Sequence, residues 1–446
     1  MEKKEKIISR IKDIVFVFIV IFTLSKLYGL FRTYYFNGFT KAEYNSGQTT
    51  FSRDAKEKYS EAYSYKLESK TFNDAMFYKT IDVEPNTPYK ISCMIKTENV
   101  EPNKVNTDAG AQICIVDTTN CSKIITGTND WQKIEYIFTS NNETELKLGF
   151  RLGGNQGECK GTAWFSDFKL EKGMANTDNN WNFGCFIIKN VDINLPDKGE
   201  VQISMNQSDI ETVKTNMERF KGACEELSNN KMQATYDIQE ISEPLKTVTY
   251  SDEFGYYVDP SDVRDLLLDY IEKDNYDHIF VVVRLGEDEK EDVEIKDWIG
   301  LGGMDLQGIG FSNIRLPNSR KSYIYTYSPG INNFPEEVFV HEFLHSLEKI
   351  LIDNKYNIPE LHDYNKYGYK EKILVGLKQW YQDYMRCEVK DENGNYIGLN
   401  EKVYSLKPAH EDNFKYSIEI QFNDEPKNFI ENIKMLIEGI GEQSKK

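Results

Sequence analysis

The sequence predicts a multidomain protein with an N-terminal transmembrane helix, an all-β sandwich and a C-terminal α+β domain. Three observations lead to this prediction: an apolar run near the N-terminus, short segments of alternating hydrophobicity in residues 36–174, and alternating strand and helix patterns in residues 180–446. A chain of 446 residues is long for one domain, so at least two separate hydrophobic cores are expected.

The acidic composition argues against one class of partner. The net charge is −18 at pH 7, and 39% hydrophobic with 28% charged residues is an ordinary globular balance. Because nucleic-acid binding requires a basic surface that neutralises phosphates, we expect no nucleic-acid partner.

Residues 1–35 have the pattern of a membrane anchor. Basic residues precede the uncharged apolar run Ile14–Leu24, which continues to Phe31 with Lys26 as its one charged interruption. Positive charge marks the cytoplasmic end of such a segment, so the rest of the chain should be extracellular. No small-residue cleavage site follows, since the first alanine is Ala42, and we therefore expect an uncleaved single-pass anchor in the cell membrane. The alternative is a cleaved signal peptide and a secreted protein.

The seven cysteines form no C-x-x-C pair. An extracellular location permits disulfides, but their connectivity cannot be deduced from spacing, and the odd count leaves at least one cysteine unpaired. The cysteines are Cys93, Cys114, Cys121, Cys159, Cys185, Cys224 and Cys387.

Residues 36–174 contain strand patterns and no convincing helix. Apolar and polar residues alternate in short segments separated by turns. Strands at this spacing predict a β-sandwich. The segments are Tyr65–Leu67, Met76–Val83, Tyr89–Lys96, Ala111–Val116, Trp131–Phe138, Leu146–Leu152 and Ala163–Leu170.

This region resembles the jelly-roll carbohydrate-binding modules that are appended to secreted enzymes. The likeness lies in Glu84–Tyr89 before a strand, Trp131 at the start of a late strand, and the closing stretch Trp164–Phe168. The resemblance implies a jelly-roll sandwich and a carbohydrate partner. Both tryptophans follow strand patterns in which core packing is the commoner role, so we assign no sugar-binding residue from the sequence.

After a polar linker at residues 174–180, strands alternate with helices, which predicts a sheet covered by helices. A capping box at Ser208–Glu211 marks the start of the first helix. His278 begins a buried strand pattern, and we expect it to be a core histidine rather than a metal ligand. The expected strands are Phe183–Asn194, Gln233–Ile241 and His278–Leu285, and the expected helices are Ser208–Leu227, Pro260–Glu272 and Glu371–Met385.

The clearest chemical signal is the pattern H-E-x-x-H at His341, Glu342 and His345. Apolar residues repeat around it at helical spacing, so one face of a helix is buried and the motif lies on another. Two histidines four residues apart can reach one Zn²⁺, with Glu342 placed beside the open position as a base for water. The sequence therefore predicts a catalytic zinc site on this helix.

A catalytic zinc site needs a third protein ligand. We choose His362, because three of the five histidines then fall within 22 residues. Glu348 lies seven residues after His341, on the same helix face, where it either orients a histidine or is a plain surface carboxylate. The alternatives for the third ligand are Glu360, Asp363 and Glu371.

Residues 180–446 resemble the zincin metallopeptidases. The H-E-x-x-H helix and the glycine-rich stretches Trp298–Gly303 and Gln307–Arg315 before it carry the resemblance. The metzincin continuation is absent, since Glu348 and Leu351 stand where that subclass has Gly and His. The resemblance implies a zincin-like catalytic domain, a peptide substrate and a substrate-binding edge strand around Gly308–Ile314.

Zincins commonly stabilise the oxyanion with a Tyr or His that follows the motif. By this resemblance we choose Tyr369 as the second catalytic residue after Glu342, which is the general base. The other candidates are Tyr364, Tyr367 and His410.

The sequence thus predicts a membrane-anchored extracellular zinc metallopeptidase that hydrolyses peptide or glycoprotein substrates. One alternative is a catalytically inactive, zincin-like surface protein that binds metal. The other is a surface protein whose β-sandwich binds carbohydrate or a protein partner. The predicted metal ligands are His341, His345 and His362.

Overall fold

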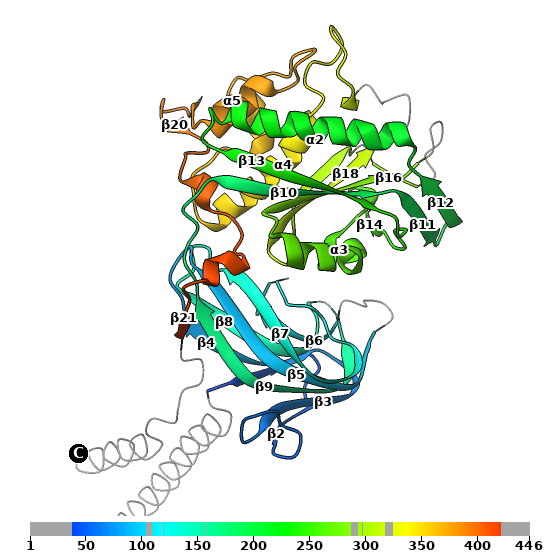
Figure 1. Ribbon diagram of the computed structural model, residues 1–446, viewed down its shortest axis with the longest axis vertical. Coiled ribbons are helices and arrows are strands. Elements are labelled where there is room, and N and C mark those ends of the chain that lie inside the picture. The colour runs from blue at the N-terminus through cyan, green and yellow to red at the C-terminus, as the bar shows by residue number, and fades with distance from the viewer. Residues whose placement is uncertain are drawn as a thin grey trace, which may run out of the picture.

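The computed structural model describes residues 38–103, 109–118, 120–155, 157–286, 293–296, 298–316 and 324–420. Two layered units stand one above the other in Figure 1, an all-β unit below and an α+β unit above. The predicted membrane anchor, residues 1–35, lies outside the described residues. Within the described ranges, no helix combines the length and apolarity that crossing a membrane requires.

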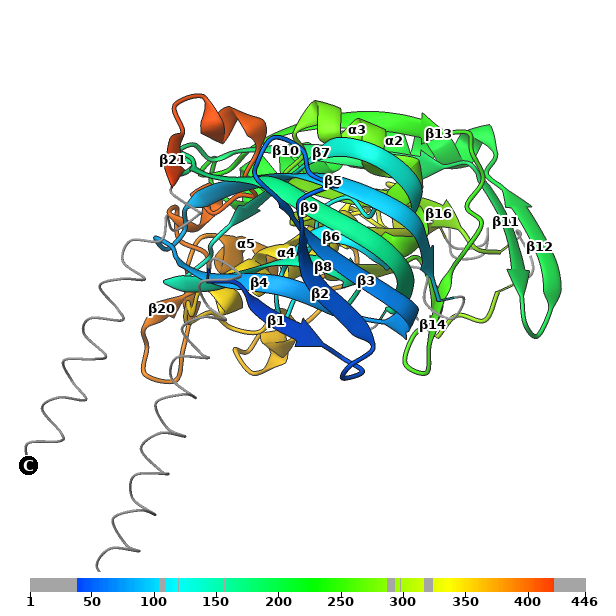
Figure 2. The ribbon, with the colours of Figure 1, turned by 90° about the horizontal axis from the view of Figure 1, so that it is seen from below.

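The first unit is an antiparallel β-sandwich. One sheet has the strand order β1-β4-β8-β6, and the other has the order β2-β3-β9-β5-β7, with β21 also paired to β9. Figure 2 shows the two sheets stacked face to face. The strands are β1 (Thr40–Glu43), β2 (Thr49–Asp54), β3 (Ser64–Asn73), β4 (Ala75–Asp82), β5 (Pro88–Pro102), β6 (Gly110–Ile115), β7 (Gly127–Thr139), β8 (Glu145–Gly153), β9 (Cys159–Lys172) and β21 (Ile418–Ile420).

The sandwich core follows the alternation seen in the sequence. Leu67, Ile91 and Phe165 each occupy an inward position of their strand and are fully buried between the sheets. The expectation that both tryptophans pack in this core is wrong. Trp164 is buried, but its indole N–H donates to Asp54 on the outer face, and Trp131 is only half-buried and stays outside the core.

The second unit is built on a five-stranded sheet with the order β13-β10-β16-β18-β17. The first four strands are parallel, and the edge strand β17 runs antiparallel to β18. Every residue of β16 is buried, as expected for a parallel strand covered on both faces. The strands are β10 (Asn180–Ile188), β13 (Gln233–Ile241), β16 (His278–Arg284), β17 (Gly300–Leu306) and β18 (Ile309–Leu316).

Helices cover both faces of this sheet (Figure 1). On one face Phe183 packs with residues of α2 and α4, and on the other Phe186 packs with residues of α3. The capping box of α2 is Asn206 with Asp209, not Ser208 with Glu211, because the Asn206 side chain accepts from the Asp209 N–H. The helices are α2 (Gln207–Leu227), α3 (Pro260–Asp274), α4 (Glu337–Asp353) and α5 (Lys378–Met385), with short 3₁₀ turns η2 (Leu361–Asn365), η3 (Val403–Ser405) and η4 (Glu411–Phe414).

Three hairpins complete the second unit. One predicted strand and one predicted helix have different bounds in the structure. The predicted strand Phe183–Asn194 is divided between β10 and the next hairpin, and the predicted helix Glu371–Met385 begins only at Lys378. The hairpins are β11 (Asn190–Leu195) with β12 (Gly199–Ser204), β14 (Thr249–Ser251) with β15 (Gly255–Tyr257), and β19 (Val389–Lys390) with β20 (Tyr396–Ile397).

The end of the described chain returns to the sandwich. Strand β21 pairs with the end of β9, and Lys90 of β5 forms an ion pair of 2.9 Å with Glu411 of η4. A boundary at residue 180 therefore separates the two cores but leaves residues 418–420 on the sandwich sheet.

Candidate metal centre

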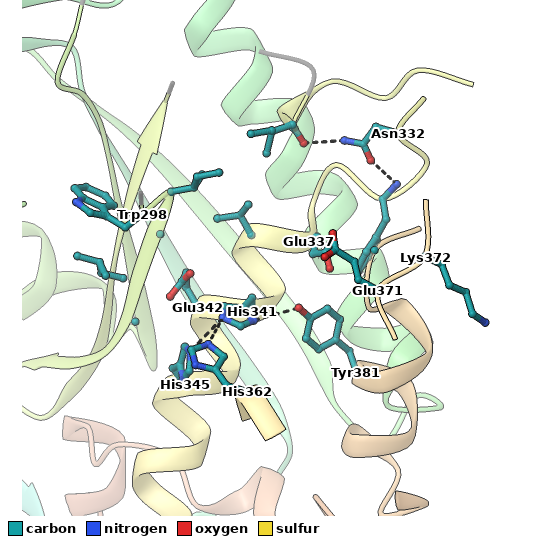
Figure 3. Close-up of a pocket in the computed structure, with 18 of the residues that line it drawn as sticks. Trp298, Asn332, Glu337, His341, Glu342, His345, His362, Glu371, Lys372 and Tyr381 are labelled. Atoms are coloured by element: carbon teal, nitrogen blue, oxygen red, sulfur yellow. Dashed lines mark hydrogen bonds between the residues drawn. The ribbon is translucent and has the colours of Figure 1, made fainter. Parts of the chain in front are cut away.

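Helix α4 presents two different faces. Phe339, Phe343 and Leu347 are fully buried against the sheet and α2, as the apolar repeat predicts. His341 and His345 lie on the other face, where Figure 3 shows their rings beside His362. One apolar stripe therefore fixes the helix and aims both motif histidines at a cleft.

The three histidines meet at their Nε2 atoms. Those of His341 and His345 are 3.1 Å apart, and the Nε2 of His362 is 3.0 Å from the first and 3.2 Å from the second. Nitrogens bound to one tetrahedral zinc ion at 2.0–2.1 Å lie about 3.3 Å apart, so this arrangement fits a three-histidine metal site. Burial, followed by the neighbouring histidines, lowers the pKa of His341 to about 3, and burial also lowers the pKa of His362.

His362 reaches the cluster from η2, which follows α4 after a short loop. Within the described residues, the group that could hold a metal comprises the three histidines and no carboxylate. Glu371 lines the same cleft but does not join this group. The arrangement therefore favours His362 over Glu360, Asp363 and Glu371.

Glu348 holds two of the histidines in place. Its carboxylate accepts from the Nδ1–H of His345 at 3.0 Å and from the backbone N–H of Leu361 at 2.6 Å. The first bond leaves the Nε2 lone pair of His345 facing the cluster, and the second ties the segment before His362 to α4. This is the orienting role, not that of a plain surface carboxylate.

Tyr381 of α5 contacts the Nδ1 atom of His341, as Glu348 contacts that of His345. Its hydroxyl lies 3.1 Å from His341 Nδ1 and also interacts with the half-buried carboxylate of Glu337. With the hydroxyl proton donated to Glu337, the oxygen accepts from Nδ1–H and leaves Nε2 of His341 free for a metal. Neither residue is among those predicted from the sequence. Glu337 precedes His341 by four residues and so shares its helix face, which was a usable signal, whereas nothing local marks Tyr381.

Glu342 is 5% exposed and lies under the edge strand of the sheet. Burial raises its pKa to about 7, partly offset by His345 and by the N–H of Gly302. A Cβ atom at Gly300 would come within 2.4 Å of the Glu342 side chain, and one at Gly302 within 2.2 Å of its carbonyl oxygen. The glycines of β17 thus let the strand pass directly over the general-base candidate.

The edge strand is β17 and not the region around Gly308–Ile314. Strand β18 (Ile309–Leu316) is bonded on both sides, to β16 and to β17, and cannot pair with another chain. The sequence pattern could not separate these neighbouring strands, because both are short segments that contain glycine, and only their pairing shows which one lies at the edge.

A cleft of about 1140 Å³ opens between β17 and the loops after α4. Its wall includes Trp298, Leu301, Glu342 and the three histidines. Figure 3 shows Glu342 beside the three histidine rings. His341 contacts Tyr381 at 3.1 Å and His345 contacts Glu348 at 3.0 Å, in both cases through Nδ1. The Nε2 atoms of these two histidines therefore stay directed at His362.

Tyr369 does not occupy the position expected of a catalytic tyrosine. Its hydroxyl donates to Asp383 at 2.6 Å, its ring packs against Trp380, and it does not line the cleft. His410 bonds to Asp277 near the sandwich, and Tyr364 and Tyr367 pack against the core. Among the described residues, the tyrosine that lines the cleft is Tyr381. His278 is a core residue as predicted, fully buried with Nε2 3.1 Å from Ser312 Oγ, and burial lowers its pKa to about 3.

The comparison with protein-family models gives no match to this chain. Among curated proteins, the chain is similar to the tRNA(Glu)-specific nuclease WapA of Bacillus subtilis subsp. natto, with 30% identity over 106 residues, which are 23% of this chain and 4% of that protein. The tRNA nuclease WapA of Bacillus subtilis strain 168 is 29% identical over 106 residues with the same coverage. The chain therefore spans about 4% of the length of these curated relatives.

Among solved structures, the chain is similar to TmCBM61 in complex with β-1,4-galactotriose, with 12% identity, a TM-score of 0.23, and coverage of 31% of this chain and 92% of the other. The family 16 carbohydrate binding module-2 is 16% identical with a TM-score of 0.21, over 30% and 89% of the two chains. Tailspike protein 4 of bacteriophage CBA120 is 15% identical with a TM-score of 0.22, over 30% and 19%. TM-scores this low do not support the fold assignment. The assignment of a β-sandwich rests on the strand pairings given above.

Proposed function

We propose that the α+β domain is a zinc-dependent hydrolase that cleaves peptide bonds. The observation that carries the proposal is the convergence of three histidine Nε2 atoms within 3.0–3.2 Å, on a cleft that also contains the buried carboxylate of Glu342. Three histidines with an adjacent carboxylate base form a ligand set typical of catalytic rather than structural zinc, because one coordination position stays open.

His341, His345 and His362 would hold the ion, and Glu348 and Tyr381 would keep their rings oriented. When bound, zinc supplies Lewis acidity towards water and the substrate carbonyl. Glu342, with a pKa of about 7, is suited to accept a proton near neutral pH and to return it to the leaving amine.

A peptide is the substrate class that best fits the cleft. Gly300, Leu301 and Gly302 of the edge strand β17 line it, and the far side of β17 pairs with no other strand in the described residues. An extended peptide can add to such an edge through main-chain hydrogen bonds and so place a carbonyl over Glu342. The extracellular location and the choice between protein and glycoprotein substrates stay predictions from the sequence.

The test combines metal analysis with peptide cleavage. The purified chain should contain one zinc, which is lost in His341→Ala, His345→Ala and His362→Ala but kept in His410→Ala, a matched histidine variant outside the cluster. Glu342→Gln should keep the zinc and lose cleavage of a peptide library.

Two outcomes would count against the proposal. Absence of zinc from the unmutated chain would remove the metal site. Zinc binding without cleavage of any peptide would favour the alternative of an inactive, zincin-like surface protein.

Carbohydrate binding by the sandwich is a second candidate, and one observation favours it. On the outer face of the six-stranded sheet, Tyr59 is 52% exposed and its ring centroid lies 6.0 Å from that of half-buried Trp131. Lys96 lies beside this pair and bonds to Glu57 at 2.8 Å. Neighbouring aromatic rings with polar groups at their edge can stack on and hydrogen-bond to sugar rings.

A glycan array probed with the full chain tests this candidate. Binding that disappears in Trp131→Ala but persists in Glu342→Gln would support it, since the two sites are on different domains. Equal binding by the Trp131→Ala variant would exclude this face.

A further inference from the structure

A second cavity lies between the two domains, away from the metal cleft. It has a volume of about 630 Å³, within the range of small-molecule sites. The sandwich contributes the end of β7, including Tyr136 and Thr139. The α+β domain contributes the β17–β18 turn, Ser346 in the C-terminal half of α4, and Asn354, which caps that helix. The cavity therefore exists only where the two domains meet.

Buried polar atoms without a partner are concentrated on this cavity. Among the described residues, five that line it each have a polar side-chain atom that is shielded from solvent and bonded to no other group of the protein. Such atoms destabilise the fold and are rare in native proteins. These atoms are Asn120 Oδ1, Tyr136 Oη, Thr139 Oγ1, Ser346 Oγ and Asn354 Oδ1.

The individual contacts leave these groups without a partner inside the protein, although each atom is closed to solvent. The Asn354 amide donates to Ile350 O at 2.8 Å, which leaves its Oδ1 as an acceptor. Tyr136 packs its ring in the sandwich core, and burial raises the pKa of its hydroxyl well above the usual value, so it is a neutral donor. Ser346 and Thr139 have hydroxyl groups that can turn into the cavity by rotation about one bond.

The charges around the cavity indicate a neutral guest. Lys349 is paired with Asp305 at 3.2 Å, and Lys407 is paired with Asp178 at 2.9 Å. Glu143 is exposed at the rim. Of the described residues that line the cavity, the ones with unbonded polar atoms carry only hydroxyl and amide groups.

The remaining wall is apolar, with Phe138, Met304 and Ile350 among its residues. A guest must therefore be neutral, offer hydroxyl groups that both donate and accept, and have apolar ring faces. We propose that this interdomain cavity is a saccharide-binding site, separate from both the metal cleft and the outer face of the sandwich. Because it is lined by α4 and by β7, a bound saccharide would bridge the domains.

The site is tested on the full chain with Trp131→Ala as background, so that the outer face does not contribute. Lactose, cellobiose and N,N′-diacetylchitobiose are screened by saturation-transfer NMR, and a dissociation constant is measured for those that bind. Adding Tyr136→Phe and Asn354→Leu together should weaken binding about tenfold, because each removes one hydrogen bond of about 0.5–1.5 kcal/mol while nearly keeping the side-chain volume.

Tyr384→Phe is the matched control, because the Tyr384 hydroxyl is also buried without a partner but does not line the cavity. Circular dichroism checks the fold of every variant, and Ser346→Ala is the fallback if the double variant is unstable. Unchanged affinity in the double variant or in Ser346→Ala would overturn the proposal. So would the absence of binding by all three sugars in the Trp131→Ala background.

Discussion

Both domains bury an ionisable side chain, and they treat it differently. In the sandwich, the guanidinium of Arg151 donates two hydrogen bonds of 2.6 Å to the Asp74 carboxylate and one of 2.8 Å to the Gly154 carbonyl. In the α+β domain, the groups that face the Glu342 carboxylate are the Gly302 N–H and the His345 ring, and burial raises its pKa to about 7. A buried charge that is fully paired serves structure, whereas one left without a counter-ion beside a cleft is a candidate for chemistry.

The largest expected effect is on turnover. Glu342→Gln should lower kcat/KM by about 10²–10⁴-fold, the usual contribution of a general base. The melting temperature of the metal-free variant should not fall, because an unpaired buried carboxylate has been removed. A clear loss of stability would mean that Glu342 has a structural role, as Arg151 does. The difference between the two buried charges would then not hold.

The next effect concerns the paired charge. Arg151→Leu should destabilise the sandwich by about 3–5 kcal/mol, since it leaves Asp74 with an uncompensated charge in the fold. Urea unfolding measures the loss, and zinc content should not change. The control is Lys133→Leu, which removes the exposed pair with Glu135 of 2.6 Å and should cost less than about 1 kcal/mol.

A smaller effect is expected for the residue that orients two histidines. Glu348→Gln should weaken zinc binding by about 10–100-fold, because the acceptor of the His345 Nδ1–H is altered while the three nitrogens remain. Competition with a fluorescent chelator gives the affinity. Glu360→Gln, a nearby variant that forms no bond to a histidine, should bind zinc as the unmutated chain does.

The smallest effect tests whether a shifted pKa alone marks function. The pKa of His278 falls from 6.5 to about 3 on burial, so the unfolded chain binds a proton below pH 6.5 that the folded chain does not. Its contribution to stability is complete above pH 6.5 and is lost as the pH falls towards 3. Between pH 7.5 and 5.5 the loss is about 1.4 kcal/mol.

The His278→Leu variant should lack this part of the pH dependence, which is read as the difference between urea unfolding curves of the two proteins at each pH. Zinc content and cleavage should be kept in the variant. If activity were lost with no change in the pH dependence of stability, His278 would belong to the site after all.

Several features follow from local sequence alone. The period-two alternation of residues 36–174 predicts the strands of the sandwich, because successive strand residues face opposite sides whatever lies beyond them. The 3.6-residue repeat around His341 predicts α4 and its two faces, because the helical period alone decides which residues share a face. Glu348 could be named as an orienting residue because its helix face is fixed by spacing.

Other features depend on where distant segments meet. The bond between Glu348 and the backbone of Leu361 brings His362 to the site, and the packing of α5 brings Tyr381 there. Neither contact can be predicted from the spacing of residues in the sequence. The error at Tyr369 has the same origin, since its hydroxyl is directed to Asp383 by a fold that spacing does not encode.

The sequence by itself determined the alternating strands of the sandwich, helix α4 and the two motif histidines on it, because helix and strand periodicity are properties of consecutive residues. The tertiary structure decided the position of His362 beside the two motif histidines, the identity of the edge strand, the exposure of Trp131 and the cavity between the domains. Each of these depends on contacts between residues far apart in the chain, and such contacts are set by how whole elements pack rather than by local spacing.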